Sequence, residues 1–218
     1  MSSDYLNNYR KITNLVNSYE KEYNKNIKLV VVSKTQDYRK IVELHKNGQN
    51  DFGENYVDEA ESKMKKINNP TIEWHFIGKI QSNKIKKISE YFSWVHTIYT
   101  EKHAKRLDSF CFQLNKIMNV CIQINIDNEE SKGGVDINDY ENLAKVICQM
   151  KNIKLRGIMA IPSPNNSSSN AFTKMKDLYN SYANLDTLSM GMSKDYLSAI
   201  ENDANMIRIG QQIFGERR

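Results

Sequence analysis

The chain has few cysteines and no long apolar segment. The first argues against a metal site built on cysteines, and the second against a membrane-spanning helix. Its three cysteines, Cys111, Cys121 and Cys148, stand far apart, and no two of them form a C-x-x-C pair. An odd number of dispersed cysteines is typical of reduced thiols in a cytosolic protein and offers no spacing for a metal site. The longest apolar runs, such as Leu29–Val32, have the length of a strand, well short of the roughly 20 residues that span a bilayer.

The sequence also lacks a strong charge imbalance. It has 31 basic and 26 acidic residues, which leave a net charge of +5. Lysine-rich stretches such as Lys63–Lys66 and Lys84–Lys87 are not interleaved with aromatic residues, as a single-strand nucleic-acid binder would require. We therefore interpret them as solvated helix faces and expect neither a nucleic-acid nor a membrane partner. Met1–Tyr5 has no apolar stretch behind a basic one, so no secretory signal is expected and a cytoplasmic location is the default.

Short segments rich in β-branched residues alternate regularly with longer stretches of helical period. The predicted strands are Lys28–Ser33, Asp51–Gly53, Ile72–Ile77, Trp94–Ile98, Val120–Ile126, Leu155–Ile161, Thr187–Met190 and Met206–Ile209. The predicted helices are Asp4–Tyr23, Asp37–Lys46, Tyr56–Ile67, one that begins near Ser82, Glu101–Leu114, Asn138–Met150, Ala171–Ala183 and Lys194–Glu201. A chain of 218 residues is long enough for one sizeable core and short for two, so we expect a single domain.

Eight strands in alternation with helices predict an α/β fold with parallel strands joined by right-handed crossovers. Eight is the number that closes a (β/α)8 barrel of the TIM type, here preceded by an N-terminal helix. An open doubly wound sheet would favour fewer strands and a glycine-rich turn after the first one. That turn is Ser33–Gln36 in this chain and contains no glycine, so the sequence favours a single barrel.

Barrel active sites lie where strands end, and Lys34 stands at the end of the first strand. It shares one face of that strand with Val30 and Val32. Loss of water at the top of an apolar strand favours the neutral, nucleophilic amine, which can condense with an aldehyde. The alternative is a lysine that reaches solvent at the barrel rim.

Two other strand ends carry polar residues with more than one interpretation. Asn55 follows Gly53 and Glu54 at the end of the second strand, where it can face the barrel mouth, cap the next helix, or do both. His75, in the third strand, is either a site residue or a buried core histidine. The segment Ser131–Gly134 after the fifth strand, with Lys132, is either an anion-contacting loop or simply a turn.

The last two strands end in segments suited to a phosphate group. Ser189–Ser193 ends the seventh strand, with Ser193 placed to cap the next helix, and Arg208–Gln211 ends the eighth. Small residues and backbone N–H groups in these two loops favour phosphate binding. A nucleophilic lysine beside a phosphate site indicates a phosphorylated aldehyde or ketone. Pyridoxal 5′-phosphate (PLP) held as an imine is one solution, and the substrate of a sugar-phosphate aldolase is another.

Several segments, in order from about residue 28 to 215, carry a family resemblance. They are Val31–Thr35, Phe52–Tyr56, Trp74–Gly78, Gln81–Lys84, Glu129–Gly134, Arg156–Pro162, Leu188–Ser193 and Arg208–Gly210 with Phe214–Gly215. These segments resemble the pyridoxal phosphate homeostasis protein family, whose PLP-binding barrel is similar to the N-terminal domain of alanine racemase. The resemblance covers nearly the whole chain and implies a single PLP-binding barrel domain over residues 1–218.

The resemblance implies a protein of intracellular PLP homeostasis and carriage that holds PLP as a Schiff base and has no established catalytic turnover. It assigns no catalytic residue and no metal. The cofactor-binding residues that it implies are Lys34 for the imine, Ser193, Gly210 and Gln211 for the phosphate with Ser189 close by, Arg208 for the pyridine nitrogen, and Asn55, His75 and Met159 along the pocket. Its implied partners are PLP and, as recipients, apo forms of PLP-dependent enzymes.

An arginine at the pyridine nitrogen has a chemical consequence. Arg208 stays protonated and can only donate, so the ring nitrogen is left unprotonated and the cofactor is a weaker electron sink. This disfavours transamination and decarboxylation and suits storage of PLP. The alternative is a PLP-dependent racemase-like enzyme, but racemases of this fold take a second base from an additional C-terminal domain. This chain ends at Arg218, so we expect no such domain and a monomer.

One departure from the family concerns lysines. Relatives often have a second lysine and a proline after the Ser-Lys-Thr motif, whereas this chain has Gln36 and Asp37. A transfer route that uses the extra lysine is therefore in doubt. Whether Lys132 serves as a second PLP acceptor stays open.

Overall fold

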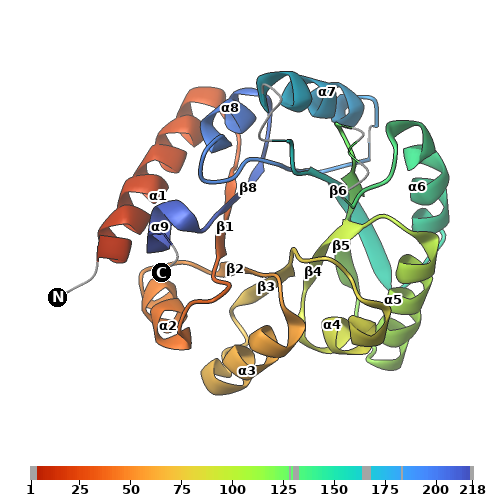
Figure 1. The fold of residues 1–218 in the computed structure, drawn as a ribbon, viewed down its shortest axis with the longest axis horizontal. Coiled ribbons are helices and arrows are strands. Elements are labelled where there is room, and N and C mark those ends of the chain that lie inside the picture. The colour runs from red at the N-terminus through yellow and green to blue at the C-terminus, as the bar shows by residue number, and fades with distance from the viewer. Residues whose placement is uncertain (1–3, 128, 130–132, 164–167, 183, 217–218) are drawn as a thin grey trace.

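Eight parallel strands close into a barrel, and the helices that connect them surround it (Figure 1). The computed structural model describes residues 4–127, 129, 133–163, 168–182 and 184–216. The strands are β1 (Lys28–Val32), β2 (Asp51–Glu54), β3 (Glu73–Phe76), β4 (Trp94–Ile98), β5 (Met118–Ile124), β6 (Ile153–Ala160), β7 (Thr187–Ser189) and β8 (Met206–Ile209). Each strand pairs with the next, and β8 returns to pair with β1, so the predicted (β/α)8 barrel is confirmed.

Helices follow the strands in the predicted alternation, and the predicted N-terminal helix precedes them. They are α1 (Asp4–Tyr23), α2 (Tyr38–Lys46), α3 (Val57–Ile67), α4 (Ile85–Tyr91), α5 (Glu101–Gln113), α6 (Tyr140–Cys148), α7 (Ser168–Asn180), α8 (Tyr196–Glu201) and α9 (Gln211–Phe214). Short 3-10 turns, Ser82–Lys84 and Ile137–Asp139, lead into α4 and α6. The sequence pattern did not predict α9, because four residues are too few to display a helical period.

Strand ends differ from the prediction where strands are buried on both faces. β5 begins at Met118 and β6 at Ile153, each earlier than predicted. Met118 pairs with Ile153, so the two strands extend together. Parallel strands covered by helices show no alternation of apolar and polar residues, and the pattern therefore gives no clear boundary.

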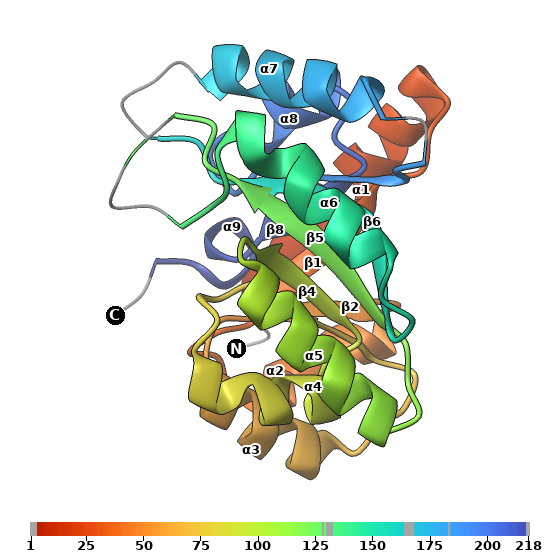
Figure 2. The same cartoon turned by 90° about the vertical axis from the view of Figure 1, so that its right-hand side faces the viewer.

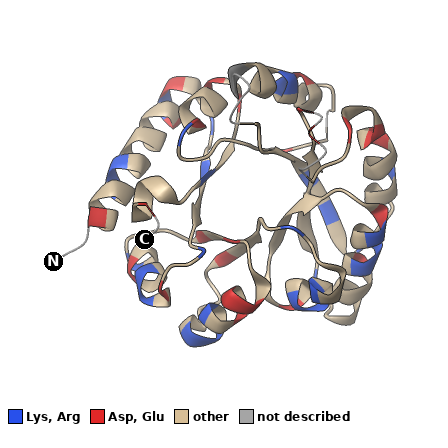
Figure 3. Cartoon of the chain, in the orientation of Figure 1, with Lys and Arg blue, Asp and Glu red and all other residues tan. Residues whose placement is uncertain are grey.

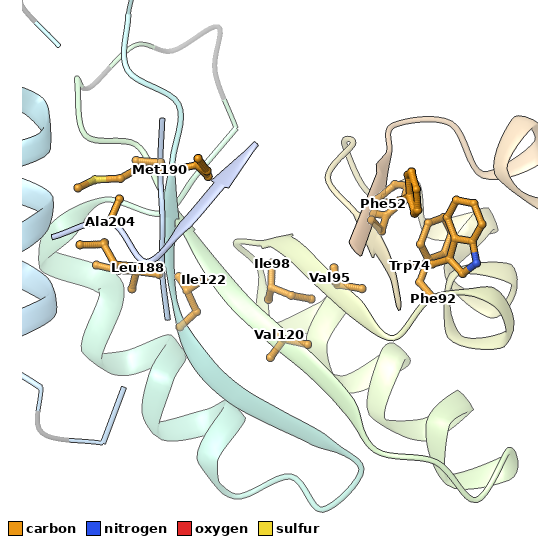
Figure 4. Close-up of a cluster of buried hydrophobic side chains, with 14 of the residues drawn as sticks. Phe52, Trp74, Phe92, Val95, Ile98, Val120, Ile122, Leu188, Met190 and Ala204 are labelled. Atoms are coloured by element: carbon orange, nitrogen blue, oxygen red, sulfur yellow. The ribbon is translucent and has the colours of Figure 1, made fainter. Parts of the chain in front are cut away.

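The two faces of the barrel wall have different surroundings. Val95, Val120, Ile122 and Leu188 belong to the large apolar cluster between the strands and the helices (Figure 4). Alternate residues point inward, where a second, smaller cluster fills the barrel interior. Its buried members are Val30, Trp94, Cys121, Met159 and Met206.

The outer surface carries charges of both signs. Figure 3 shows lysine and arginine interspersed with aspartate and glutamate along the surrounding helices, without a face of one sign. Within the described ranges, no helix combines the length and apolar character needed to cross a membrane. Those residues also contain no group of three or more histidine, cysteine or carboxylate side chains that could hold a metal ion.

Candidate functional site

A cavity of about 760 Å³ opens at the carboxyl ends of the strands, where β1 and β8 meet and close the barrel. Its wall comes from the loops after β1, β6, β7 and β8, together with α9. Figure 2 shows that α9 lies on the same side of the molecule as the loops that follow β5 and β6. The lining residues are Val32, Lys34, Gln36, Pro162, Ser163, Met192, Ser193, Lys194, Asp195, Arg208, Gly210, Gln211, Phe214, Gly215 and Glu216. The carboxyl ends of the strands are where barrels of this type hold ligands.

Lys34 reaches this cavity from a tight turn that follows β1. The N–H of Gln36 donates to the carbonyl of Ser33 at 3.0 Å, and Thr35 inside the turn has a φ of 64°. A positive φ is rare for a β-branched residue. The N–H of Thr35 donates to Glu59 Oε1 at 2.5 Å, which holds this conformation in place. The half-buried Lys34 is therefore flanked by fixed backbone on both sides.

A buried ion cluster beneath the turn fixes it further. The ammonium of Lys63 donates to the carbonyl of Ser33 at 2.7 Å, to Glu54 Oε1 at 2.7 Å and to Glu59 Oε1 at 2.6 Å. The hydroxyl of Ser33 also donates to Glu54 Oε1, at 2.7 Å. Burial raises the pKa of Glu54, and the neighbouring Lys63 opposes this shift. The cluster joins β1, β2 and α3 directly below Lys34.

The sequence assigned Lys63–Lys66 to a solvated helix face, and for Lys63 this is wrong. Lys63 is 7% exposed, whereas the side chain of Lys65 is 63% exposed. The physical reason is helical period: Lys63 shares the inner face of α3 with Val57 and Ala60, at spacings of three residues. That spacing, together with Glu59 four residues earlier, was the signal that could have identified it.

Arg208 lines the cavity from β8 and is 3% exposed. Its Nη1 donates to Ser189 Oγ at 2.7 Å and its Nη2 to the carbonyl of Ala160 at 3.0 Å. Burial lowers the pKa of Arg208 to about 10, so the guanidinium remains a cation at neutral pH. The cavity therefore has a fixed positive group and donor in its wall.

The loops after β7 and β8 come close to their neighbours because two positions are glycine. A Cβ at Gly210 would lie 2.9 Å from the carbonyl oxygen of Val32, and one at Gly191, where φ is 88°, would lie 2.6 Å from Ala199 Cβ. The N–H of Gln212 donates to Ser193 Oγ at 3.3 Å, which joins the two loops. Small residues thus bring the backbone of both loops to the edge of the cavity.

The predicted cap at Ser193 is wrong, and of the two interpretations of Asn55 the helix cap is excluded. α8 begins at Tyr196, with Asp195 at the N-cap position, so Ser193 precedes the helix and contacts α9. α3 begins at Val57, with Tyr56 at the N-cap position, so Asn55 is not a cap. Both helices start later than predicted, α3 by one residue and α8 by two, and the residues that precede α8 line the cavity.

The predicted site residues divide into two groups. Lys34, Ser193, Arg208, Gly210 and Gln211 line the cavity. The other four lie outside the lining. Met159, Ser189 and His75 are buried in the barrel interior, and Asn55 is half-buried, with a buried Oδ1 that lacks a hydrogen bond within the described residues.

The sequence missed several residues that matter at this site. Lys194 and Phe214 line the cavity, and Phe214 belongs to the helix α9 that the pattern did not predict. His96, which follows Trp94 by two residues on β4 and so faces the barrel interior, hydrogen-bonds to His75.

The loop after β6 is tied to the loop after β5. The N–H of Ser163 donates to Asp127, and its hydroxyl donates to Glu129 Oε1 at 2.5 Å, shorter than a usual hydrogen bond. These contacts hold Ser163 at the cavity wall. Lys132, considered above as a second acceptor, lies outside the described residues.

Comparisons with known proteins agree on one family. The chain matches the family model of the alanine racemase N-terminal domain over residues 6–218. The pyridoxal phosphate homeostasis protein of Pasteurella multocida is 43% identical over 202 residues, which are 88% of this chain and 87% of the relative. The protein of the same name from Escherichia coli is 39% identical over 201 residues, or 88% and 86% of the two chains.

Solved structures are also similar to this chain. PipY of Synechococcus elongatus, solved with PLP bound, has a TM-score of 0.81 and 31% identity, over 87% of this chain and 92% of that chain. Alanine racemase of Clostridium difficile has a TM-score of 0.76 and 16% identity, over 97% of this chain and 57% of that chain. The likeness to the racemase concerns the fold alone.

Proposed function

This chain belongs to the pyridoxal phosphate homeostasis protein family, and we propose that it binds PLP in the cavity beside Lys34 and acts in PLP homeostasis. The observation that carries the proposal is the meeting of Lys34, Arg208 and the loops after β7 and β8 around one cavity. The name of the curated relatives and the PLP bound to PipY support it.

The cavity fits the cofactor in size and in donor chemistry. Its volume of about 760 Å³ lies within the range of small-molecule sites, roughly 300 to 1,000 Å³. A phosphate needs donors and close approach of backbone, which Ser193, Gly210 and Gln211 offer at the cavity edge. Lys194 adds a positive charge to the same wall.

When bound, PLP supplies an aldehyde with which a lysine amine can condense to a Schiff base with loss of water. We assign this amine to Lys34, which lines the cavity from the turn held by the Lys63 cluster. Arg208 lines the cavity from β8, the strand that pairs with β1, and would donate to the ring nitrogen, which would then stay an acceptor. Ser193, Gly210 and Gln211 would hold the phosphate, and Ser189 would act through Arg208.

We propose that the protein stores and transfers PLP and does not turn over amino acids. A racemase needs a proton-transfer group on each face of its substrate, and the described residues that line the cavity include no tyrosine and no histidine. The names of the relatives describe homeostasis. We further propose that the protein acts as a cytoplasmic monomer and that apo forms of PLP-dependent enzymes are its recipients.

The proposal is tested by titrating the purified protein with PLP, followed by absorbance, borohydride reduction and peptide mapping. We expect a saturable imine band and an adduct on Lys34, and we expect Lys34→Ala to abolish both. Lys194→Ala is the matched control, since this second lysine lines the same cavity but is expected to leave the adduct in place. An undiminished band in Lys34→Ala would overturn the assignment.

A further inference from the structure

A chain of hydrogen bonds crosses the barrel interior from the amino-terminal end of β2 to the cavity. Asp51 Oδ1 lies 3.0 Å from His75 Nε2, and His75 Nδ1 lies 2.9 Å from His96 Nε2. His96 Nδ1 then lies 3.0 Å from Ser189 Oγ, which accepts from Arg208 Nη1 at 2.7 Å. Because His96 is on β4 and Ser189 on β7, their contact spans the inside of the barrel.

The two end groups of this chain of hydrogen bonds fix the direction in which its bonds are donated. Arg208 can only donate and the carboxylate of Asp51 can only accept. Burial lowers the pKa of His75 and lowers that of His96 well below its usual value, so both rings are neutral and each has a single N–H. The hydrogen bond from His75 and the nearby Lys28 lower the pKa of Asp51 although burial opposes them, so its carboxylate is ionised.

These constraints leave one assignment of protons. His75 must carry its proton on Nε2 to donate to Asp51, so its Nδ1 accepts from Nε2 of His96. His96 Nδ1 then accepts from the hydroxyl of Ser189, whose oxygen lone pairs remain for Arg208. Every donor in the chain meets an acceptor.

The reversed assignment is unfavourable. It would turn the Nε2 lone pair of His75 toward the carboxylate of Asp51. It would also make Ser189 accept from both His96 and Arg208, and the described residues offer its hydroxyl hydrogen no other acceptor.

We propose that Asp51, His75 and His96 are positioning residues for Arg208, and that the carboxylate at the far end of the barrel fixes the orientation of the guanidinium at the cavity. Asp51 determines which nitrogen of each histidine bears the proton, and this in turn points the Ser189 hydroxyl away from Arg208. The effect on PLP rests on the function proposed above, whereas the direction of the chain does not depend on it.

The test compares Asp51→Leu with Asp186→Leu. Lys28 donates to the same Oδ1 of Asp51 at 2.7 Å and would hold an asparagine carbonyl in that place, whereas a leucine side chain of similar size neither donates nor accepts and so sets no direction. Asp186 precedes β7, pairs with Arg156 at 2.8 Å and does not belong to the chain, so its variant controls for the loss of a carboxylate near the end of a strand. Long-range 1H–15N correlation spectra of the PLP-free protein report the tautomer of each histidine.

In the unmodified protein and in Asp186→Leu, we expect His75 and His96 to be neutral with the proton on Nε2. In Asp51→Leu, we expect both to show an Nδ1-protonated population. We also expect PLP to dissociate from Asp51→Leu about five-fold faster, which corresponds to about 1 kcal/mol, the contribution of one hydrogen bond. An Nδ1 proton or an imidazolium in the unmodified protein would overturn the inference, as would unchanged tautomers in Asp51→Leu or equal dissociation rates in the two variants. If PLP does not bind, the proposed function fails, and the spectra still decide the inference.

Discussion

Removal of the Lys63 ammonium should destabilise the protein strongly, because the group is the centre of the buried cluster below Lys34. Breaking a buried ion pair costs about 3 to 5 kcal/mol, since the remaining charge stays buried. Glu59 can regain water because its side chain is 28% exposed, whereas that of Glu54 is 0% exposed. We therefore expect Lys63→Met to lower the free energy of unfolding by about 3 kcal/mol at about pH 8, near the lower end of that range.

The loss should depend on pH through Glu54. Burial already raises the pKa of this carboxyl, and removal of Lys63 should raise it further. The folded state then holds a proton over a pH range in which the unfolded chain, with a pKa near 4.5, has released it. Stability of the variant therefore falls as the pH rises above that value, and the loss at about pH 5 should be the smaller one.

Urea unfolding followed by the fluorescence of the buried Trp74 and Trp94 measures both effects, provided that the slope with urea is unchanged. Lys65→Met is the control, because Lys65 pairs with Glu61 while its side chain is 63% exposed, and such pairs contribute less than about 1 kcal/mol. The double variant Lys63→Met/Glu54→Gln should recover part of the loss and remove its pH dependence. A Lys63→Met protein as stable as the control, or a loss independent of pH, would refute this account.

Backbone conformation and burial give two further predictions. Gly191→Ala should lower the free energy of unfolding by at least about 2 kcal/mol, because it adds a clash with Ala199 to the strain of a φ of 88°. Gly48→Ala, with a φ of 97° and open space, should lower it by only about 1 kcal/mol. Thermal unfolding distinguishes the two variants, and equal losses would contradict the predicted clash. A thiol reagent should modify the exposed Cys148 alone in the native protein, because burial shields Cys111 and Cys121 and raises their pKa values to about 11 and about 12; rapid labelling of a second cysteine would contradict this.

Much of the fold could be predicted from the sequence because each strand and helix of the barrel has its own local pattern of apolar residues. Each short apolar segment is followed by a helical stretch, and eight such units are the number that closes a (β/α)8 barrel. Strand ends were less predictable. The amino-terminal ends of β5 and β6 are determined by the pairing of Met118 with Ile153. This is a contact between strands, and no local sequence pattern indicates it.

The site could be predicted only where it lies along a strand end. Lys34 was found because it follows an apolar strand, whereas the role of Arg208, which lies within β8, was implied by the family resemblance. Both line the same cavity because Val30 pairs with Arg208 when β8 closes on β1. The roles of Lys63 and His96 depend on contacts with distant segments: Lys63 hydrogen-bonds to Ser33, and His96 to Ser189 across the barrel. The local sequence around a lysine in a charged run, or around a single histidine in a strand, does not indicate such contacts.

Closure of the barrel also explains why a helix that precedes it supports the site without lining it. α1 lies beside α9, as Figure 1 shows, and the side chain of Asn8 donates to the carbonyl of Ile213 at 3.3 Å. The rings of Tyr5 and Phe214 have centroids 6.0 Å apart, and Phe214 lines the cavity. α9 has only four residues and cannot be stable alone. The support from α1 therefore fixes the β8 side of the cavity, just as the Lys63 cluster fixes the β1 side.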